Sequence, residues 1–297
     1  MRRAVLLVVH TGRQHNLRTA EKVAGQLIDA GLLVRVLDEE APEIEAHCFS
    51  EVVTADTEAA DGTELVFALG GDGTILRAAE LARMAGVPVF GVNLGRVGFL
   101  AGADSDDLDD AVGAVVRGVY HVEERMTIDV TAWLDGEVLA RTWALNEASV
   151  EKSSRERILD VVVEVDEHPV SAFGCDGVLC STPTGSTAYA FSAGGPVVWP
   201  EVQALVVLPS NAHALFARPL VVARDSLVAL EVDQHGHEAV LCCDGQRHFD
   251  LPPGVRIEVT AGGTPVRLVR LYDTPFTDRL VRKFELPVQG WRGPSAE

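Results

Sequence analysis

The stretch ELVFALGGDGT, residues 64–74, decides the fold. Its first six residues are mainly apolar, which is typical of a strand buried on both faces of a parallel sheet. A glycine turn follows at once, and a helical pattern then continues from Thr74 to Ala85. Ligands of open α/β sheets bind at such corners, because these lie at the carboxyl end of a strand and beside a helix N-terminus. The stretch therefore predicts an α/β domain with a binding site at the turn.

Strand and helix signals alternate on both sides of this turn. Three more apolar runs predict strands over residues 4–10, 33–37 and 87–93. Apolar residues at helical spacing predict a helix over 17–28, and an acid-capped helix is expected over 104–117. Because such alternation is typical of an open, mostly parallel sheet with helices on its faces, we expect a Rossmann-like α/β domain over residues 1–125.

The pattern changes after residue 125. Asp135-Gly136 predicts a hairpin turn, and short β runs continue from there to residue 271 with little helical periodicity. An all-β, β-sandwich-like domain is therefore expected over residues 126–272. A helical pattern returns at 277–284 and is too short to be stable alone, so we expect the tail, residues 273–297, to dock on the first domain.

Composition disfavours several classes of partner. The 297 residues carry 25 basic and 44 acidic side chains, a formal net charge of −19, which argues against nucleic acid as the main partner. No run of about 18 uninterrupted apolar residues occurs, so no membrane association is expected. The five cysteines are odd in number and lack CxxC spacing, which indicates reduced thiols and a cytoplasmic protein.

The residue types in GGDGT indicate phosphate chemistry. Glycines let backbone N–H groups approach a phosphate chain, and the following helix adds its positive end. Asp72 would repel a phosphate, so it fits better beside a hydroxyl that loses a proton, or beside a metal ion. The alternative, a tight turn in which Asp72 only accepts backbone hydrogen bonds, stays open. A P-loop NTPase and a standard dehydrogenase are disfavoured, because neither GxxxxGK[ST] nor GxGxxG occurs.

Two further stretches carry polar groups suited to a nucleotide. TPTGSTAYAFSAGGP, residues 182–196, gathers hydroxyls, glycines and aromatic rings that can face a base and its sugar. Asn146-Glu147 supplies a carboxylate for vicinal ribose hydroxyls and an amide for a base edge. The first stretch is also compatible with an ordinary wide turn, and the second alone is a weak signal.

Together these stretches resemble the NAD kinase family along nearly the whole chain. The resemblance rests on GGDGT at 70–74, GVNLGRVGFL at 91–100, LNE at 145–147, DG at 176–177 and the loop at 182–196. GGDGT alone is shared with lipid kinases, but GGDGT followed by NE and TPTGSTAY is specific. The family transfers the terminal phosphoryl group of ATP, or in some members of polyphosphate, to the 2′-hydroxyl of the adenosine ribose of NAD, which gives NADP.

The resemblance implies a set of site residues. Asp72 would be the catalytic proton acceptor at the ribose hydroxyl. The implied substrate-binding residues are Gly70, Gly71, Gly73, Thr74, Arg77, Phe99, Asn146, Glu147, Arg157, Asp176, Thr184, Thr187, Ala188, Tyr189, Ser192 and Gln246. Gly174 stands where some members carry arginine, so a charge contact at that position is absent.

Within this set the resemblance distinguishes several roles. Gly73 and Arg77 would lie against the dinucleotide or the phosphates, and Phe99 would wall the adenine side. Asn146 and Glu147 would hold the adenosine. The residues at 187–192 would line adenine and ribose, with Gln246 closing the site. Asp176 would reach the nicotinamide side, and Arg157 would sit near the substrate.

The resemblance also implies ATP or polyphosphate as donor, NAD as acceptor, and a homodimer or homotetramer assembled through the second domain. Because no P-loop lysine is present, a divalent cation, most naturally magnesium, is expected to neutralise phosphate charge, without a dedicated protein metal site. Two alternatives stay open. A lipid kinase of the diacylglycerol or sphingosine type shares GGDGT, but the charge of −19 disfavours a membrane-facing surface. A non-catalytic NAD(P)-binding regulator is disfavoured by the presence of Asp72.

Overall fold

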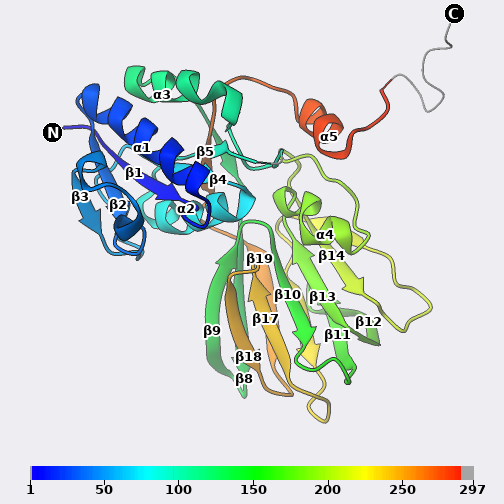
Figure 1. Cartoon of the computed structure of the whole chain (residues 1–297). Coiled ribbons are helices and arrows are strands. Elements are labelled where there is room, and N and C mark those ends of the chain that lie inside the picture. The colour runs from blue at the N-terminus through cyan, green and yellow to red at the C-terminus, as the bar shows by residue number, and fades with distance from the viewer. Residues whose placement is uncertain (1, 96, 289–297) are drawn as a thin grey trace, which may run out of the picture. The chain divides into compact units, whose positions relative to one another are not determined.

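The structure, a computed structural model, describes residues 2–95 and 97–288 (Figure 1). Arg96 of the glycine-rich run and residues 289–297 of the expected tail lie outside the described residues. The chain forms two compact units, the first from Met1–Glu124 and Val266–Glu297 and the second from Arg125–Pro265. The first unit is α/β and the second is all-β, so the predicted fold class is confirmed.

The first unit contains an eight-stranded sheet in the order β3-β2-β1-β4-β5-β20-β7, with β6 beside β5. Its pairs from β3 to β20 are parallel. The strands are β1 Ala4–Val9, β2 Leu33–Leu37, β3 Glu51–Val53, β4 Leu65–Gly70, β5 Val89–Asn93, β6 Ala103–Asp104, β7 His121–Arg125 and β20 Val266–Arg270. The helices are α1 Gln14–Asp29, α2 Asp72–Ala85, α3 Leu108–Arg117 and α5 Phe276–Phe284, with short 3₁₀ turns at Ala41–Glu43, Ala46–Cys48 and Ser105–Asp107.

The central strands β1, β4 and β5 place the candidate site. Every residue of these strands is buried, and Phe67 packs against Phe90 with 5.4 Å between ring centroids. The chain moves from β1 outward to β2 and later returns to β4 on the other side of β1. Ligands of open α/β sheets bind outside the carboxyl ends of the strands where the strand order reverses in this way. Gly70 at the end of β4 lies at that point.

One strand differs from the sequence-based expectation. The β pattern at residues 266–271 places this segment, by sequence, among the β runs of the second domain. In the structure Leu268 pairs with Val89 of β5 instead, so β20 belongs to the sheet of the first unit, which resumes at Val266. Periodicity indicates that a segment is a buried strand but not which strand it pairs with. The assignment of this strand to the second domain is therefore wrong.

The second unit consists of two antiparallel sheets in the orders β15-β14-β13-β10-β17-β18 and β12-β11-β16-β19-β8-β9. The first sheet is formed by β10 Glu147–Lys152, β13 Gly177–Ser181, β14 Ala204–Ser210, β15 Leu220–Ala223, β17 Ala239–Cys243 and β18 Arg247–Leu251. The second is formed by β8 Ile128–Leu134, β9 Glu137–Ala144, β11 Leu159–Val165, β12 His168–Cys175, β16 Val228–Val232 and β19 Arg256–Ala261. Turn η4 Thr184–Thr187 and helix α4 Tyr189–Ser192 connect β13 to β14.

A buried apolar cluster joins the two sheets into the expected sandwich. It draws Val150 and Leu241 from the first sheet and Val161 and Ile257 from the second. The two sheets therefore face each other across one core. The predicted hairpin turn Asp135-Gly136 joins β8 to β9, with both residues at positive φ.

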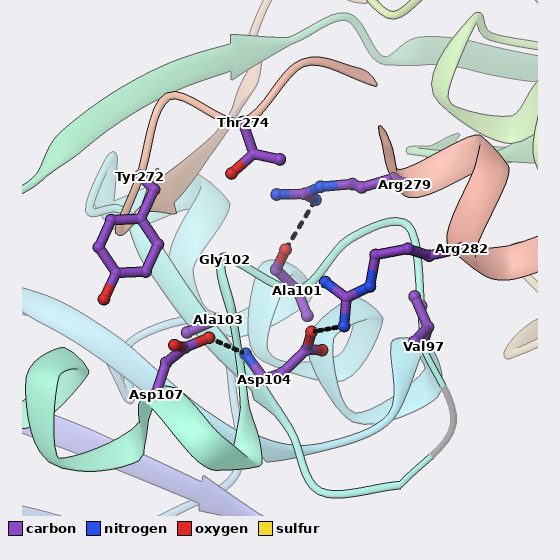
Figure 2. A pocket seen from close by; sticks show the side chains of 11 residues that line it. Val97, Ala101, Gly102, Ala103, Asp104, Asp107, Tyr272, Thr274, Arg279 and Arg282 are labelled. Carbon is purple, nitrogen blue, oxygen red and sulfur yellow. Dashed lines mark hydrogen bonds and ion pairs between the residues drawn. The ribbon is translucent and has the colours of Figure 1, made fainter. Parts of the chain in front are cut away.

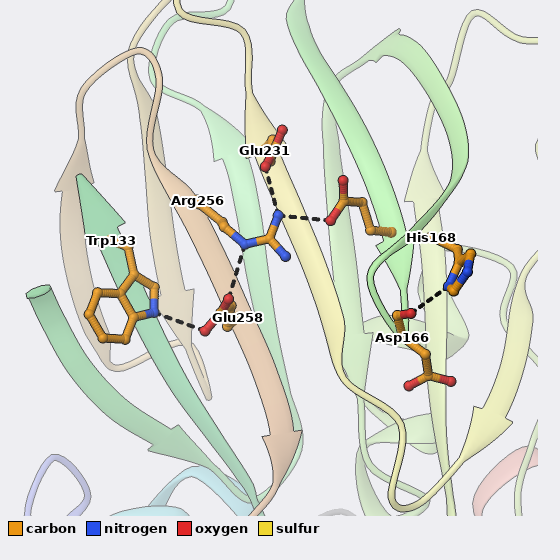
Figure 3. A network of polar contacts seen from close by, with 7 residues as sticks. Trp133, Asp166, His168, Glu231, Arg256 and Glu258 are labelled. Carbon is orange, nitrogen blue, oxygen red and sulfur yellow. Dashed lines mark hydrogen bonds and ion pairs between the residues drawn. The ribbon is translucent and has the colours of Figure 1, made fainter. Parts of the chain in front are cut away.

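A polar network ties four strands together on the face of the second sheet opposite this core (Figure 3). Arg256 forms ion pairs with Glu164 at 2.8 Å, Glu231 at 2.6 Å and Glu258 at 3.0 Å. Trp133 Nε1 donates a hydrogen bond to Glu258 at 2.9 Å. These contacts link neighbouring strands side by side, which helps to fix their pairing register.

The helices of the first unit include the expected docked C-terminal helix. Arg279 of α5 donates hydrogen bonds to the carbonyl oxygens of Phe99 and Ala101, and Arg282 pairs with Asp104 at 2.7 Å. The predicted return of the chain end to the first unit is therefore confirmed for the described residues. Among these residues, no helix is long and apolar enough to cross a membrane.

Candidate functional site

The GGDGT turn places a carboxylate at the N-terminus of a helix. β4 ends at Gly70, Gly71 is the N-cap residue, and α2 begins at Asp72. Gly70 has to be a glycine, because a Cβ there would lie 2.3 Å from Thr74 Oγ1. At Gly71 and Gly73 an added Cβ would meet nothing within 4 Å. The backbone at these two positions is therefore open to a ligand that approaches closely.

A second loop holds the Asp72 carboxylate in place. Phe99 N–H donates to Oδ2 and Leu100 N–H donates to Oδ1, both at 3.2 Å. Gly98 lies against the same carboxylate, since a Cβ there would be 2.2 Å from Oδ1. A carboxylate has about four acceptor positions, so each oxygen of Asp72 keeps capacity for another donor. The turn thus presents an oriented carboxylate at the carboxyl end of β4.

A cavity of about 540 Å³ opens at the carboxyl ends of the central strands. The described residues that line it are His10, Arg13, Asn16, Gly70, Gly71, Asn93, Leu94 and Gly95. None of these residues is acidic. Arg13 is the N-cap of α1 and Gly71 is the N-cap of α2, so two helix N-termini begin at the cavity. Helix N-termini and an arginine both favour anions, so the cavity suits a chain of phosphates.

Two more implied residues, Arg77 and Phe99, also belong to the first unit. Arg77 lies on α2, and its guanidinium is ion-paired with Glu39 and, at 3.2 Å, with Glu40. Glu40 is 2% exposed, and burial raises the pKa of its carboxyl to about 7. Phe99 is buried in the loop that holds Asp72. The contacts of Arg77 and Phe99 with a substrate stay predictions.

In the second unit, Asp244 organises the backbone before β10. Its carboxylate accepts Leu145 N–H at 2.9 Å and Asn146 N–H at 2.7 Å, and Arg247 pairs with it at 2.9 Å. Asp244 N–H in turn donates to the carbonyl oxygen of Glu147 at 3.0 Å. Asp244 therefore holds both the N–H of Asn146 and the carbonyl oxygen of Glu147.

Glu147 is a buried carboxyl beside another carboxyl. Burial first, and then the neighbouring Asp244, raise the pKa of Glu147 to about 8, although Tyr189 N–H donates a hydrogen bond to it. Near pH 7 the group is mostly protonated, so it can donate a hydrogen bond as well as accept one. Its Oε2 has no hydrogen-bond partner among the described residues. A buried polar atom of this kind is costly, and it suits a place where a ligand supplies the partner.

The TPTGSTAY segment packs directly on Asn146. Ser181 Oγ and Thr182 N–H donate to the carbonyl oxygen of Asn146 at 3.2 and 2.9 Å. Gly185 lies so close to the Asn146 backbone that a Cβ there would be 2.0 Å from that oxygen. The implied residues Thr184, Thr187, Ala188, Tyr189 and Ser192 follow in or between η4 and α4. The structure therefore brings this segment together with Asn146-Glu147.

Asp176 lies at the other end of β10. Its carboxylate is ion-paired with Lys152 and accepts Asn211 Nδ2–H at 2.8 Å. The Lys152 and Asn211 hydrogen bonds hold the pKa of Asp176 below its ordinary value. Glu147 and Lys152 are five residue steps apart on one strand, a distance of about 17 Å. The implied adenosine and nicotinamide residues thus mark two ends of an extended strip.

Gln246 and Arg157 belong to opposite ends of this strip. Gln246 lies in the turn between β17 and β18, two residues after Asp244, and so near Glu147. Arg157 lies in the turn after β10, where its Nη1 is 3.4 Å from His237 Nε2. Arg157 is therefore placed away from the Asn146-Glu147 end.

Several residues that position the site are not found by sequence reasoning. Asp244-Gly245 carries a turn signal, and both residues have positive φ, but the pattern does not show that the carboxylate reaches residue 146. Gly98 belongs to a glycine-rich run whose contact with Asp72 exists only in the folded chain. Arg13 belongs to no sequence motif, and only the folded chain places it at the cavity.

Comparison with known proteins places both units in one family. Residues 5–120 match the family model described as the ATP-NAD kinase N-terminal domain. Residues 145–271 match the family model described as the ATP-NAD kinase C-terminal domain. Together the two matches cover most of the chain and contain Asp72, Asn146-Glu147 and the 182–196 loop.

Whole-chain relatives agree with the family models. The NAD kinase 2 of Streptomyces coelicolor is 57% identical over 292 residues, which are 98% of this chain and 97% of the relative. The NAD kinase of Mycobacterium bovis is 55% identical over 302 residues, which are 98% of either chain.

Two solved structures share the fold. The crystal structure of an NAD kinase from Archaeoglobus fulgidus in complex with ATP has a TM-score of 0.73 at 25% identity, over 97% of this chain and 100% of that chain. The crystal structure of yeast NADH kinase complexed with NADH has a TM-score of 0.87 at 20% identity, over 97% and 88% of the two chains.

Proposed function

Since the chain belongs to the ATP-NAD kinase family and phosphorylates NAD to NADP, we propose that Asp72 is the general base of that reaction. The observation that supports this proposal is the fixed carboxylate, which accepts Phe99 N–H and Leu100 N–H and keeps acceptor capacity on both oxygens. A ribose hydroxyl is a weak nucleophile near pH 7, and a positioned base contributes about 10²–10⁴-fold to the rate.

The proposed step is direct transfer to the 2′-hydroxyl of the adenosine ribose. The hydroxyl proton passes to Asp72, and the hydroxyl oxygen forms a bond to the terminal phosphorus of ATP. The bond from that phosphorus to its bridging oxygen breaks, and ADP leaves with the electron pair. We expect alignment and neutralised phosphate charge to contribute more to the rate than the proton transfer itself.

The donor phosphates are proposed to lie in the cavity lined by His10, Arg13 and Gly71. Two helix N-termini and the arginine supply positive potential there, and no described lining residue supplies a carboxylate. ATP is the donor that the family uses. Polyphosphate presents the same chain of anionic phosphates, and an assay with either donor decides whether both are accepted.

The residues at the turn fit a divalent cation that arrives with the nucleotide. Within the described residues no group of three or more His, Cys, Asp or Glu side chains could hold a metal ion. Magnesium is commonly bound by one or two carboxylates together with substrate phosphates and water, and Asp72 next to the phosphate cavity meets that requirement. When bound, the ion would neutralise phosphate charge. The chain itself orients the carboxylate and lines the phosphate path.

NAD is proposed to bind along the strip marked by β10. Asn146 and Glu147 would hold the adenosine, where the mostly protonated Glu147 can both donate to and accept from ribose hydroxyls. Asp176 would receive the nicotinamide side at the opposite end, held by Lys152 and Asn211. Tyr189, whose N–H bonds to Glu147, would contribute its ring to the adenosine end.

The role of Asp72 is tested by comparing D72N with the wild type. Asparagine keeps the size of the side chain but does not take up the proton. With NAD, ATP and magnesium, kcat for NADP formation should fall by at least about 10²-fold, while the Kd of NAD measured by calorimetry stays within about 3-fold. A D72N enzyme with kcat near the wild-type value would refute the assignment.

We also propose that the protein is a cytoplasmic homodimer or homotetramer assembled through the second unit. Strands β9, β12, β15 and β18 end its two sheets, and open sheet edges favour pairing with another chain. Leu215, Phe216 and Val221 expose apolar side chains in or beside β15. The five free cysteines suit a reducing compartment. Light scattering gives the number of subunits, and a monomeric mass would contradict the proposal.

A further inference from the structure

The C-terminal helix α5 forms hydrogen bonds with the loop whose backbone N–H groups hold Asp72. Arg279 Nη1 donates to the carbonyl oxygen of Phe99 at 3.0 Å and to that of Ala101 at 2.7 Å. Lys283 Nζ donates to the carbonyl oxygen of Val97 at 2.6 Å. Figure 2 shows Arg279 reaching from α5 towards Ala101, beside a small pocket of about 90 Å³. Polar side chains of one helix therefore bind three carbonyl groups of one loop.

Apolar contacts also join α5 to this loop. The ring centroid of Phe99 lies 5.8 Å from that of Phe276 and 5.8 Å from that of Phe284, and both partners belong to α5. Tilted ring pairs at this separation are favourable, by about 0.5–1.5 kcal/mol beyond area burial in general. The α5 helix therefore fixes the position of Phe99 through its ring as well as through its backbone.

The peptide group between Phe99 and Leu100 connects Arg279 of α5 to Asp72. The Phe99 carbonyl accepts the hydrogen bond from Arg279, and the Leu100 N–H of the same peptide group donates to Asp72 Oδ1. A trans peptide is planar, so its C=O and N–H point in opposite directions and turn together. Hydrogen bonds at the two ends of one peptide also polarise each other. Rotation of this group would weaken both bonds at once.

We propose that Arg279 of α5 is a positioning residue for Asp72 in phosphoryl transfer. The inference rests on the proposed role of Asp72 as base. Arg279 touches neither reacting atom. It holds the Phe99–Leu100 peptide in the orientation that aims the Asp72 carboxylate.

Arg282 provides a matched control on the same helix. It follows Arg279 by three residues on α5 and pairs with the Asp104 side chain at 2.7 Å, not with the Phe99–Ala101 backbone. Its side chain is 58% exposed, so loss of that pair is expected to matter little for stability. R282Q therefore removes one arginine from α5 and leaves the hydrogen bonds of Arg279 and Lys283 to the loop in place.

The test compares R279Q, R279K and R282Q with the wild type in steady-state NADP formation from NAD and ATP. We expect R279Q to lower kcat by about 10–100-fold, since a misplacement near 1 Å can cost 10²-fold, with KM for NAD changed less than about 3-fold. R279K should recover part of kcat, because its ammonium can still donate to one carbonyl. R282Q should stay within about 2-fold. Equal kcat in R279Q and R282Q would overturn the proposal.

Two further readouts separate positioning from loss of stability. In R279Q, hydrogen exchange of the Phe99 and Leu100 amides should be faster than in the wild type, while Tm changes by only a few degrees. In the D72N background, R279Q should lower the remaining kcat by less than about 2-fold, because both changes remove the same function. Fully additive losses would overturn the proposal. A normal kcat for D72N alone would instead refute the base assignment, and a wild type that makes no NADP would refute the function.

Discussion

Replacement of Gly98 by alanine is expected to displace the Asp72 carboxylate and lower activity, although residue 72 itself is unchanged. The added Cβ would lie 2.2 Å from Asp72 Oδ1, 2.7 Å from Cγ and 2.9 Å from Oδ2. Carbon and oxygen atoms that are not bonded rarely approach within about 3.2 Å, since dispersion contacts are optimal near 3.5–4.0 Å. The carboxylate therefore has to retreat by about 1 Å or turn about its Cβ–Cγ bond.

The size of the effect follows from what this retreat breaks. Oδ1 and Oδ2 accept Leu100 N–H and Phe99 N–H at 3.2 Å, already near the long end of the normal range, so a shift of 1 Å removes at least one bond. A hydrogen bond to a charged group contributes about 1.5–3 kcal/mol. A displacement of this size at a reacting group can cost about 10²-fold in rate. We expect G98A to lower kcat by about 10²-fold.

The assay is steady-state NADP formation, with kcat and KM determined separately for NAD and ATP. G25A is the matched control, because an added Cβ at Gly25 of α1 meets nothing within 4 Å and Gly25 does not line the phosphate cavity of the same unit. Gly98 does not have a positive φ, so backbone strain does not confuse the comparison. G98A with wild-type kcat, or an equal loss in G25A, would refute the reasoning.

Three further changes test other parts of the site. R13Q should raise KM for ATP by about 10-fold with less effect on KM for NAD, because Arg13 lines the cavity at the α1 N-terminus, and equal effects on both KM values would contradict this. G185A should weaken NAD binding and lower Tm, because its Cβ would lie 2.0 Å from the Asn146 carbonyl oxygen, whereas G263A should do neither, because an added Cβ at Gly263 meets nothing within 4 Å. The Tm of E147Q minus the Tm of the wild type should increase from pH 5 to pH 8. The folded pKa of Glu147 is about 8 and its ordinary value is 4.5, so the unfolded wild type releases this proton first and stability is lost as pH rises. A difference in Tm that does not vary with pH would count against it.

The sequence was sufficient for the elements whose signal is local. ELVFALGGDGT predicts a buried strand, a glycine turn and a helix, and the structure has β4, Gly71 as N-cap and α2 beginning at Asp72. Asp135-Gly136 likewise specifies its own turn. In each case neighbouring residues determine the conformation, through burial on both faces or through tolerance of positive φ.

The parts that the sequence could not predict depend on residues far apart in the chain. β20, with the sequence VRLVR, looks like the other short strands of the second half of the chain, and only its pairing with Val89 assigns it to the first sheet. Asp244 reaches Asn146 across 98 positions, and Leu100 reaches Asp72 across 28. Such contacts are set by tertiary packing, which periodicity and turn chemistry do not encode. Positioning residues are therefore harder to find from one sequence than the residues they position.

The acidity of the chain does not extend to the described lining of the phosphate cavity. The formal charge is −19, which alone would oppose ATP and NAD. Yet the described residues that line the phosphate cavity include Arg13 and no carboxylate, and Asp72 stands beside that lining. At the proposed adenosine end, burial and the nearby Asp244 raise the pKa of Glu147 to about 8, so near pH 7 this carboxyl adds little negative charge. Local charge is therefore decided by helix N-termini and burial, and net charge decides only the long-range field, which a divalent cation and moderate salt would screen.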